Sequence, residues 1–318
     1  MNKKNYGGCM VGIVILNYNN WKDTEACLQS IKSANISMTY KVYVVDNASV
    51  VPIPQELEEY ISQHSEIVYM QSNKNTGYSA GNNLGIRAAL SDQCEFVVIS
   101  NNDILFNPDV IETLHDYLIK KPNVGIVAPM IRLYSGELQE INLGCKMTVA
   151  GKYKFFFRKT PLGFLSKKFV SQFQLNPNNI KEPTKVFAVS GCFFMISSKC
   201  LEKIGLFDEN VFLYDEEYIL GSKMEEAGLQ TILLSNIEVI HKHGQSTKSN
   251  KAFSYICLIE SEMYYFKKYV GATMFKLCAY YFIRSCQYYL KCITNDDYRK
   301  NAKSYQRKTW KAFSKKYQ

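Results

Sequence analysis

The sequence has 318 residues, of which 47% are hydrophobic and 14% aromatic, and a formal net charge of +9. This composition excludes a disordered chain and is enough to bury one large core with a smaller appendage. The positive charge is uneven, because the segment from Lys267 to the end holds 13 Lys or Arg and two acids, which leaves the rest at −2. The basic character therefore belongs to a C-terminal tail.

Membrane-spanning and secreted classes are also disfavoured. No stretch reaches the ~18 uninterrupted apolar residues of a spanning helix, and the nearest candidate, 270–283, is interrupted by Lys276. The short apolar run near the N-terminus ends in Asn17-Tyr18-Asn19-Asn20, which indicates a strand rather than a signal peptide. The ten cysteines show no CxxC pairing, so we expect reduced core residues in a cytosolic chain, without zinc or disulfides.

The first half of the chain alternates predicted strands and helices. Short β-branched or aromatic runs predict buried strands at 11–16, 42–45, 67–70 and 96–99. Helical spacing of apolar residues occupies the intervening segments 21–31, 54–63 and 77–90. Units of about 25 to 30 residues predict an α/β fold with a mainly parallel, doubly wound sheet flanked by helices.

The second half has a different character. Residues 131–185 are aromatic, basic and rich in turn residues, which fits either an acceptor-binding loop or a β-excursion with a mobile tip. The segment 186–197 predicts a strand bent at Gly191, and 231–240 predicts another strand. Between them, a helix is expected to begin after Asp215, which is a plausible N-cap.

Three predicted strands end in polar side chains. The clusters are Asn17-Tyr18-Asn19, Asp46-Asn47-Ala48-Ser49 and Ser100-Asn101-Asn102-Asp103. Each cluster alone could simply cap a helix or form a turn. Because ligands of open parallel sheets bind outside the carboxyl ends of the strands, three clusters at one edge favour a polar pocket. Neither GxxxxGK[ST] nor GxGxxG follows the first strand, so the familiar phosphate loops are excluded.

The segment 75–86 has glycines at four-residue intervals. Gly81 and Gly85 are expected to let a helix pack closely on the sheet. Gly77, after Asn75 and Thr76, opens this helix, and a helix N-terminus there favours binding of a diphosphate.

Acidic and histidine side chains mark a second candidate cluster. The acids Asp215, Glu216 and Glu217 suit the first turn of a helix, where the dipole would keep one carboxylate ionised and able to accept a proton. An acidic first turn is also common without any function. His241 and His243 follow the last predicted strand, either as surface residues or as metal ligands.

Together these motifs resemble a known family. The segments VILNYNN, VVDNAS, NTGYSAGNNLGI, SNND, SGCFFMIS, LFDENVFLYDEE and HKHGQS strongly resemble the inverting family 2 glycosyltransferases of GT-A fold, in particular rhamnosyltransferase-like enzymes of bacterial surface polysaccharide assembly. The resemblance covers roughly residues 10–248. It implies a catalytic domain at 1–248, with a nucleotide-sugar half at about 10–130 and an acceptor half at 131–248. The remainder, 249–318, is expected to be a helical, basic tail.

The resemblance also implies roles for individual residues. Asp103 matches the last acid of the DxD motif that binds Mn²⁺ or Mg²⁺, with Asn101 in place of the first acid. His241, in an H-x-x-G-x-S frame with Gly244 and Ser246, matches a second metal ligand. Glu217 matches the catalytic base, and Glu216 precedes it where the family usually has Glu-Asp. The implied donor-site residues are Asn17, Tyr18, Asn19, Asp46, Asn47, Asn75, Gly77, Asn82, Asn102 and Asp103.

The expected reaction needs few groups. Inverting transfer is one in-line displacement, for which one base and a metal that stabilises the leaving diphosphate are enough. The segment QRKTW does not fit the QxxRW pattern of processive synthases, which favours addition of a single sugar. A nucleotidyltransferase, or an inactive sugar-binding or scaffold protein, is an alternative.

The expected partners follow from the resemblance and from the tail. They are a nucleotide-sugar donor, with a dTDP- or UDP-sugar favoured, and a glycan or polyprenyl-linked acceptor. The tail alternates aromatic and basic residues, which indicates either helices packed on the catalytic domain or contact with the inner face of the plasma membrane. We favour the peripheral membrane interpretation. Nucleic acid is not expected, because no binding motif accompanies the basic residues.

Overall fold

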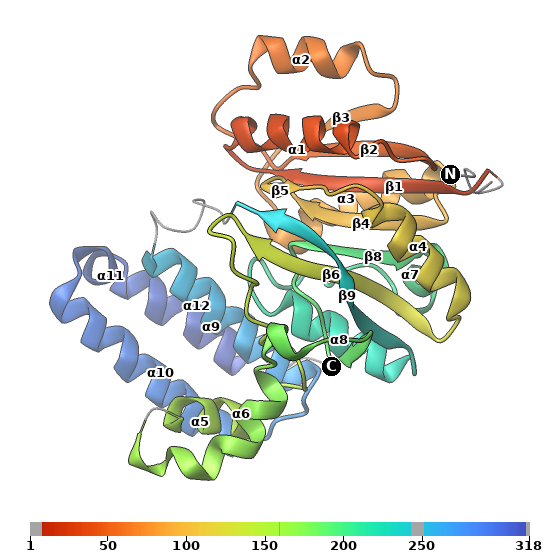
Figure 1. Ribbon diagram of the computed structural model, residues 1–318. Helices are drawn as coiled ribbons and strands as arrows, with labels where there is room; N and C mark the ends of the chain where they lie inside the picture. The colour runs from red at the N-terminus through yellow and green to blue at the C-terminus, as the bar shows by residue number, and fades with distance from the viewer. Residues whose placement is uncertain (1–7, 159, 243–250, 316–318) are drawn as a thin grey trace.

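The computed structural model describes residues 8–158, 160–242 and 251–315. Within these ranges the chain forms one nine-stranded sheet in the order β3-β2-β1-β4-β8-β6-β9-β5, with β7 also pairing with β9. Helices cover both faces of the sheet, and a layer of C-terminal helices packs beside it (Figure 1). The predicted α/β architecture is confirmed.

The two halves of the sheet differ in strand direction. β1 to β4 pair only in parallel with one another, as the sequence predicts, whereas β8 runs antiparallel to both β4 and β6. β9 is parallel to β6 and antiparallel to β5 and β7. The strands are β1 Met10–Asn17, β2 Thr39–Asp46, β3 Ile67–Gln71, β4 Phe96–Asn101, β5 Ile104–Leu105, β6 Val124–Leu133, β7 Thr184–Val186, β8 Phe193–Ser197 and β9 Gln230–His241.

Six helices pack on the two faces of this sheet. α1 Trp21–Ser33, α2 Gln55–Ser62 and α4 Val110–Lys120 share one core, while α3 Gly77–Ser91, α7 Ser198–Ile204 and α8 Glu216–Glu226 share the other. The close approach of α3 depends on its glycines, because a Cβ at Gly85 would lie 2.5 Å from Val14 Cγ1. The predicted role of Gly81 and Gly85 in packing is therefore confirmed.

Residues 131–185 contain four short helical segments joined by loops, so the β-excursion, one of the two alternatives, is not what forms. The helices are α5 Val149–Phe157, η1 Pro161–Ser166, α6 Lys167–Phe173 and η2 Pro177–Asn179. Their aromatic residues pack on one another, as Phe155 does on Phe173 at 5.5 Å between ring centroids. Aromatic packing of this kind stabilises a small helical unit that local propensity does not reveal.

The predicted strand at 186–197 is divided. β7 ends at Val186 and β8 begins at Phe193, with a turn at Gly191 and Cys192 between them. The backbone of Gly191 makes hydrogen bonds to side chains rather than to a neighbouring strand, since its N–H donates to Glu217 and its carbonyl accepts from Tyr78. The bend expected at Gly191 is therefore a break that separates two strands.

The C-terminal tail packs on the rest of the chain. It forms α9 Lys251–Lys268, α10 Met274–Thr294, α11 Asp296–Lys300 and α12 Ala302–Ser314, which share a core with residues of α5, α6 and α8. A buried ion cluster joins the layers: Glu262 of α9 lies 2.8 Å from Lys152 Nζ of α5 and 3.2 Å from Arg284 Nε of α10. None of the described helices is long and apolar enough to span a membrane.

The cysteines are free, but not all of them are core residues. Cys27, Cys94 and Cys192 are buried, as predicted, whereas Cys278 and Cys286 are exposed on α10. The expectation of ten core cysteines is therefore wrong for α10.

Candidate active site

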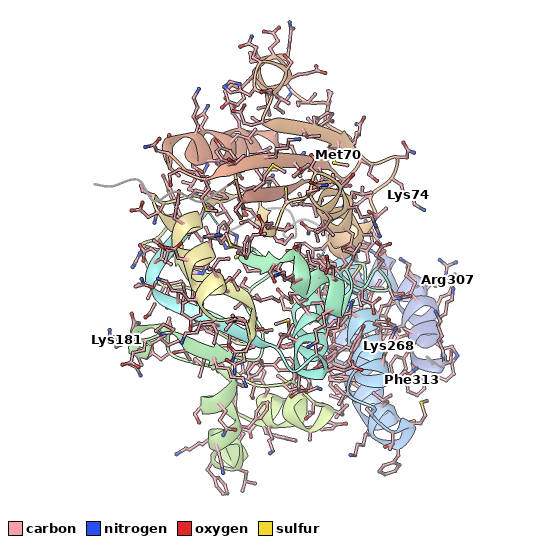
Figure 2. The ribbon with its side chains drawn as sticks, turned by 90° about the vertical axis from the view of Figure 1, so that its right-hand side faces the viewer. Met70, Lys74, Lys181, Lys268, Arg307 and Phe313 are labelled. Atoms are coloured by element: carbon pink, nitrogen blue, oxygen red, sulfur yellow. The ribbon has the colours of Figure 1, made fainter. Side chains whose placement is uncertain are left out.

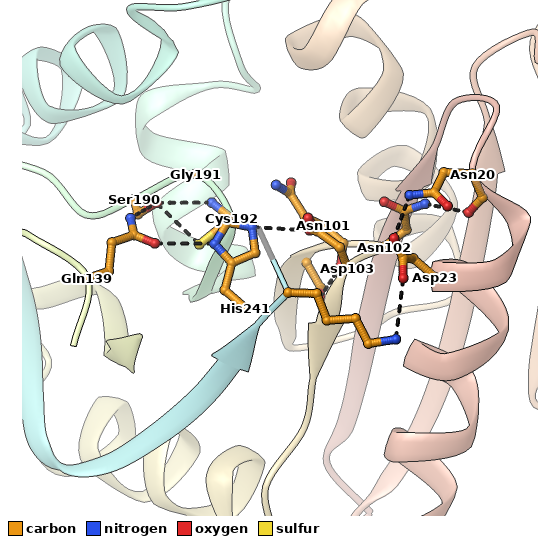
Figure 3. Close-up of polar contacts among 12 residues, drawn as sticks. Asn20, Asp23, Asn101, Asn102, Asp103, Gln139, Ser190, Gly191, Cys192 and His241 are labelled. Atoms are coloured by element: carbon orange, nitrogen blue, oxygen red, sulfur yellow. Dashed lines mark hydrogen bonds and ion pairs between the residues drawn. The ribbon is translucent and has the colours of Figure 1, made fainter. Parts of the chain in front are cut away.

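The carboxyl ends of β1, β2 and β4 meet at one edge of the sheet, as their parallel pairing requires. Asn17, at the end of β1, is completely buried. Its Oδ1 accepts hydrogen bonds from Thr24 Oγ1 and Asn102 Nδ2, both at 3.1 Å, and its Nδ2 donates to Ser49 Oγ at 3.2 Å. Figure 3 shows Asn102 directed toward Asn20, the residue before α1. This amide network locks the three strand ends together.

The loops beside this network are fixed in the same way. Asp46 is buried, and its Oδ1 accepts from Ser49 N at 3.0 Å while its Oδ2 accepts from Gln71 Nε2 at 3.2 Å. Asn19 adopts a left-handed conformation, with φ of 58°, and its Oδ1 accepts from Val50 N at 2.7 Å. Tyr18 is 41% exposed, so its ring can contact a ligand.

The N-terminus of α3 is tied to β2 and to the loop before α8. Asn47 Nδ2 donates to Asn75 Oδ1 at 3.1 Å and to Gly77 O at 3.0 Å. Gly77 has φ of +83°, and a Cβ there would lie 2.2 Å from Phe212 O, so no larger residue fits without a backbone shift. One turn further along, Asn82 is buried and donates to Tyr78 O at 3.0 Å. The expected donor-site residues thus converge, with most side chains engaged by the protein.

Asp103 and His241 form a buried pair between β5 and β9. Asp103 Oδ1 lies 3.2 Å from His241 Nε2, and His241 Nδ1 lies 3.2 Å from Gln139 Oε1 (Figure 3). The antiparallel pairing of Ile104 with His241 brings the two together. Burial opposes a charge on the imidazole, but hydrogen bonds to Asp103 and Cys192 outweigh this effect and raise the pKa of His241 to about 10.

This pair has the geometry of two adjacent ligands of a small divalent ion. Ligands about 2.1 Å from such an ion, at right angles, lie roughly 3 Å apart, close to the spacing of Asp103 and His241. Within the described residues no group of three or more acids, histidines and cysteines is gathered for a metal. His243, Gly244 and Ser246, also expected in this motif, lie outside the described residues.

The acidic cluster surrounds the start of α8. Tyr214 and Asp215 both adopt left-handed φ angles, 73° and 62°, immediately before the helix. Asp215 occupies the N-cap position but its side chain makes no capping hydrogen bond with the described residues, which corrects the expected role. Two consecutive residues in this conformation store strain, which typically persists where the surroundings fix a functional geometry.

Glu217 projects from this first turn toward Gly191, whose N–H donates to its Oε1 at 3.2 Å. Burial raises the pKa of the Glu217 carboxyl, although backbone hydrogen bonds partly oppose the shift. Burial thus acts against the ionising effect of the helix dipole that was expected for one of the three acids. A base with a raised pKa removes a proton more effectively once it is ionised.

A cavity of about 320 Å³ adjoins Glu217. Its lining also includes Asp215, Lys152, Gln139 and Ser190, with apolar residues such as Leu143 and Val189 on its other walls. Gln139 contacts His241 as well, so this cavity lies next to both the acidic cluster and the Asp103–His241 pair.

Glu216 is absent from the lining, and its Oε2 is buried without a hydrogen bond from the described residues. The geometry therefore favours Glu217 over Glu216 as the group that faces a substrate. Sequence reasoning missed Gln139, Lys152 and Tyr78. Only Tyr78 stood in a recognised motif, and the other two lie in the turn-rich stretch, where no local pattern distinguishes them.

The fold defines the class of protein. The chain superposes on the mannosyltransferase PcManGT from Pyrobaculum calidifontis, solved in complex with GDP-Man and Mn²⁺, with a TM-score of 0.55 and 14% identity over 95% of this chain and 83% of that one. At this identity the likeness concerns the fold alone. The protein has the GT-A fold of glycosyltransferases, as predicted.

The family follows from the sequence match. Residues 12–205 match the model of glycosyl transferase family 2, and the chain belongs to this family. It is 31% identical over 208 residues to the low-salt glycan biosynthesis hexosyltransferase Agl10 of Haloferax volcanii. The aligned residues are 65% of this chain but only 59% of that relative. It is 23% identical over 256 residues to N-acetylglucosaminyl-diphospho-decaprenol L-rhamnosyltransferase of Mycobacterium tuberculosis, covering 76% of this chain and 78% of the relative. The prediction of a family 2 glycosyltransferase is confirmed.

Proposed function

We propose that this protein is a nonprocessive, inverting glycosyltransferase that moves one sugar from a nucleoside-diphosphate donor to a hydroxyl group of a glycan or lipid-linked acceptor. One observation carries the proposal. The Glu217 carboxylate and the Asp103–His241 pair lie beside the same cavity, and Gln139 touches both the cavity and His241. A base and a site for the leaving diphosphate are the two groups that a single displacement requires.

Each group has a distinct task in this mechanism. Glu217, oriented by the Gly191 N–H, takes the proton of the acceptor hydroxyl as that oxygen attacks the anomeric carbon. Asp103 and His241 would hold Mn²⁺ or Mg²⁺, which supplies positive charge against the developing charge of the diphosphate. The hydrogen-bonded strand ends keep Asp103 in place, so little reorganisation accompanies charge development.

The names of the relatives support a narrower donor and acceptor. A rhamnosyltransferase acting on a decaprenol-linked sugar and a glycan-synthesising hexosyltransferase favour transfer of a rhamnosyl or hexosyl group. The family resemblance of the motifs further favours a dTDP- or UDP-sugar as donor. We place the reaction in surface polysaccharide assembly. A lipid-linked acceptor would hold the enzyme at the inner face of the plasma membrane as a peripheral protein.

The first test is a panel of dTDP-, UDP- and GDP-sugars, screened for Mn²⁺-dependent thermal stabilisation and slow donor hydrolysis. We expect one donor to stabilise the wild-type protein only with metal, and Asp103→Ala to abolish this effect. Asp23→Ala is a matched control at the same edge, because Asp23 contacts Asn20 and Lys242 rather than His241. Pyrophosphate release from a nucleoside triphosphate would instead identify a nucleotidyltransferase. A folded protein that binds no donor would indicate a scaffold.

A further inference from the structure

Helix α10 is apolar on the side that faces away from the protein. Its inner face is buried against the other C-terminal helices through Leu277, Tyr280, Arg284 and Tyr288. The large exposed side chains of the opposite face are Phe275 (87% exposed), Phe282 (68%), Leu290 (64%) and Ile293 (72%). Their spacing of seven, eight and three residues places them on one stripe of the helix.

The stripe, which we call the outer face of α10, extends over almost the whole helix. At 1.5 Å per residue, the distance from Phe275 to Ile293 is about 27 Å. Cys278 and Cys286 lie on the same stripe and are exposed as well. No Lys, Arg, Asp or Glu falls in this outward sector of the fully described helix. Soluble monomers rarely expose a continuous apolar surface of this length, and such a surface usually marks a site that binds another protein or a membrane.

A second exposed apolar group lies at the N-terminal end of α10. Phe157, Phe164 and Leu165, at the junction of α5 and η1, are 48%, 61% and 68% exposed. α5 packs on α10 there, since the rings of Phe156 and Tyr280 stack at 6.1 Å (Figure 1). Exposed apolar side chains therefore occur both on α10 and on the α5–η1 unit that packs against it.

The surroundings of this surface are strongly basic. Residues 274–315 contain ten Lys or Arg, of which Arg284 is buried and paired with Glu262, and two acids, of which Asp296 pairs with Arg299 at 3.1 Å. The exposed face of α12 repeats a basic residue every four positions, at Lys303, Arg307 and Lys311; Figure 2 labels Arg307. Trp310 of α12 is 56% exposed and contacts Tyr281 of α10, with ring centroids 6.2 Å apart. Aromatic side chains beside basic ones suit the headgroup region of a bilayer.

We propose that the outer face of α10 docks on an anionic lipid surface, with Phe275, Phe282, Leu290 and Ile293 entering the interface and the basic side chains of α11 and α12 meeting lipid phosphates. The positive charge around this face favours an anionic lipid surface over a second copy of the chain as the binding partner. Two copies joined through α10 would bring like charges together, whereas anionic lipids neutralise them. Because no described helix can span a bilayer, the helix lies in the plane of the interface.

The position of this surface suits a lipid-linked acceptor. Lys152 of α5 lines the cavity beside Glu217, and α5 packs directly on α10. Helices α5 and α10 therefore connect the cavity with the docking face. This last link rests on the proposed function, but lipid binding itself does not.

The test is co-sedimentation of the full chain with phosphatidylcholine vesicles that contain, or lack, about one third phosphatidylglycerol. We expect binding to the anionic vesicles only. The triple variant Phe275→Ser, Phe282→Ser, Ile293→Ser should lower the partition coefficient at least about tenfold, because it removes three apolar side chains that enter the lipid interface. Ile119→Ser on α4, where Ile119 is 58% exposed, is the matched control and should bind like wild type.

The native thiols give an independent measure of contact. Anionic vesicles should slow alkylation of Cys278 and Cys286 by a water-soluble maleimide, as read by peptide mass spectrometry. Wild type that stays in the supernatant, or a triple variant that binds equally well, overturns the proposal. Protection of both thiols without vesicles, together with a dimeric mass, also overturns it in favour of a second copy. Metal-dependent stabilisation by the donor should be unchanged in the triple variant. A negative result in the vesicle test therefore leaves the proposed transferase reaction untouched, and a negative result in the donor test leaves lipid binding untouched.

Discussion

Two regions of the site differ in how their buried polar groups are hydrogen-bonded. They are the donor edge, meaning the residues at the carboxyl ends of β1, β2 and β4, and the acidic region at the start of α8. At the donor edge, Asn17 and Asn47 are neutral amides whose oxygens and nitrogens are paired with other loops. Around α8, by contrast, Asp215 Oδ2 and Glu216 Oε2 are buried without a hydrogen bond from the described residues. In the first region these amides form a connected network, although Asn82 Oδ1 on the adjoining α3 is also buried without a hydrogen bond from the described residues. The second region holds acids in surroundings that disfavour their charge.

The physical consequence differs accordingly. Paired amides such as Asn17 and Asn47 fix backbone geometry without a charge of their own to desolvate, which suits them to hold the loops around a ligand. Buried carboxyl groups near one another have raised pKa values, as Glu216 and Glu217 do, mainly because of burial. Such groups are suited to exchange protons. Substitutions in the two regions should therefore change different properties.

The largest effect is expected from Glu217→Gln. If Glu217 is the base, kcat should fall by about 10²- to 10⁴-fold while the KM for the donor stays nearly constant, because the amide cannot take the acceptor proton. Steady-state transfer assays on the donor identified above would measure both constants. Wild-type kcat should also rise with pH as the Glu217 carboxyl ionises, and this rise should occur above the ordinary range of a glutamate because burial raises the pKa of Glu217.

Glu216→Gln is the matched control, since Glu216 is adjacent but absent from the cavity lining. It should retain most of the activity. A larger loss of kcat in Glu216→Gln than in Glu217→Gln would reverse the assignment of the base.

The second effect concerns the tail. Glu262 is 1% exposed and pairs with Lys152 and Arg284, which hold its pKa below the usual range although burial opposes its charge. Glu262→Ala would leave two buried cations unpaired, so we expect the free energy of unfolding to fall by about 3–5 kcal/mol in urea denaturation. The exposed pair of Lys146 and Glu225 is the control, and Glu225→Ala should cost about 0–1 kcal/mol. Equal losses in the two variants would contradict the role of the tail as part of the core.

The third effect is a dependence of stability on pH. Burial raises the pKa of Asp215 to about 7, with Lys152 opposing and Glu262 and Glu217 adding to the shift. A raised carboxyl pKa stabilises the folded state below the ordinary value near 3.8, and this contribution is lost as pH rises to about 7. Between pH 5 and pH 7, wild type should therefore lose roughly 2 kcal/mol more of its free energy of unfolding than Asp215→Asn. Parallel stability curves would show that Asp215 titrates normally.

The sequence predicted the donor edge well because its determinants are local. A buried run of β-branched residues followed by Asn or Asp predicts both a strand and the edge where it ends, and parallel order then brings Asn17, Asp46 and Asp103 together. It did not predict that Asn17 and Asp46 are enclosed by protein partners, since these partners, such as Thr24 and Gln71, become neighbours only through the fold.

The acidic region was predictable in composition but not in environment. The three acids and the helix after them follow from local pattern, yet burial of Glu217 depends on Gly191 and Tyr78, which come from distant segments. The helices at 149–173 were missed because aromatic and turn residues conceal weak helical spacing. Packing of the tail could not be predicted either, because it depends on the ion pair of Glu262 with Lys152, and these residues are 110 positions apart in the sequence.

The smallest effect should come from the contact that joins the two regions. Gly77 has a positive φ, and an added Cβ would meet the backbone oxygen of Phe212 at 2.2 Å, whereas Gly136 has a similar φ of +93° with nothing within 4 Å. Both alanine substitutions incur the conformational penalty of about 1 kcal/mol, but only Gly77→Ala must also displace the loop before α8. Gly77→Ala should therefore lose about 1–2 kcal/mol more stability than Gly136→Ala in urea denaturation. It should also lower kcat, because the displaced loop leads into the helix turn that carries Glu217. If both variants lost the same stability and kept full activity, the donor edge and the base would be mechanically independent.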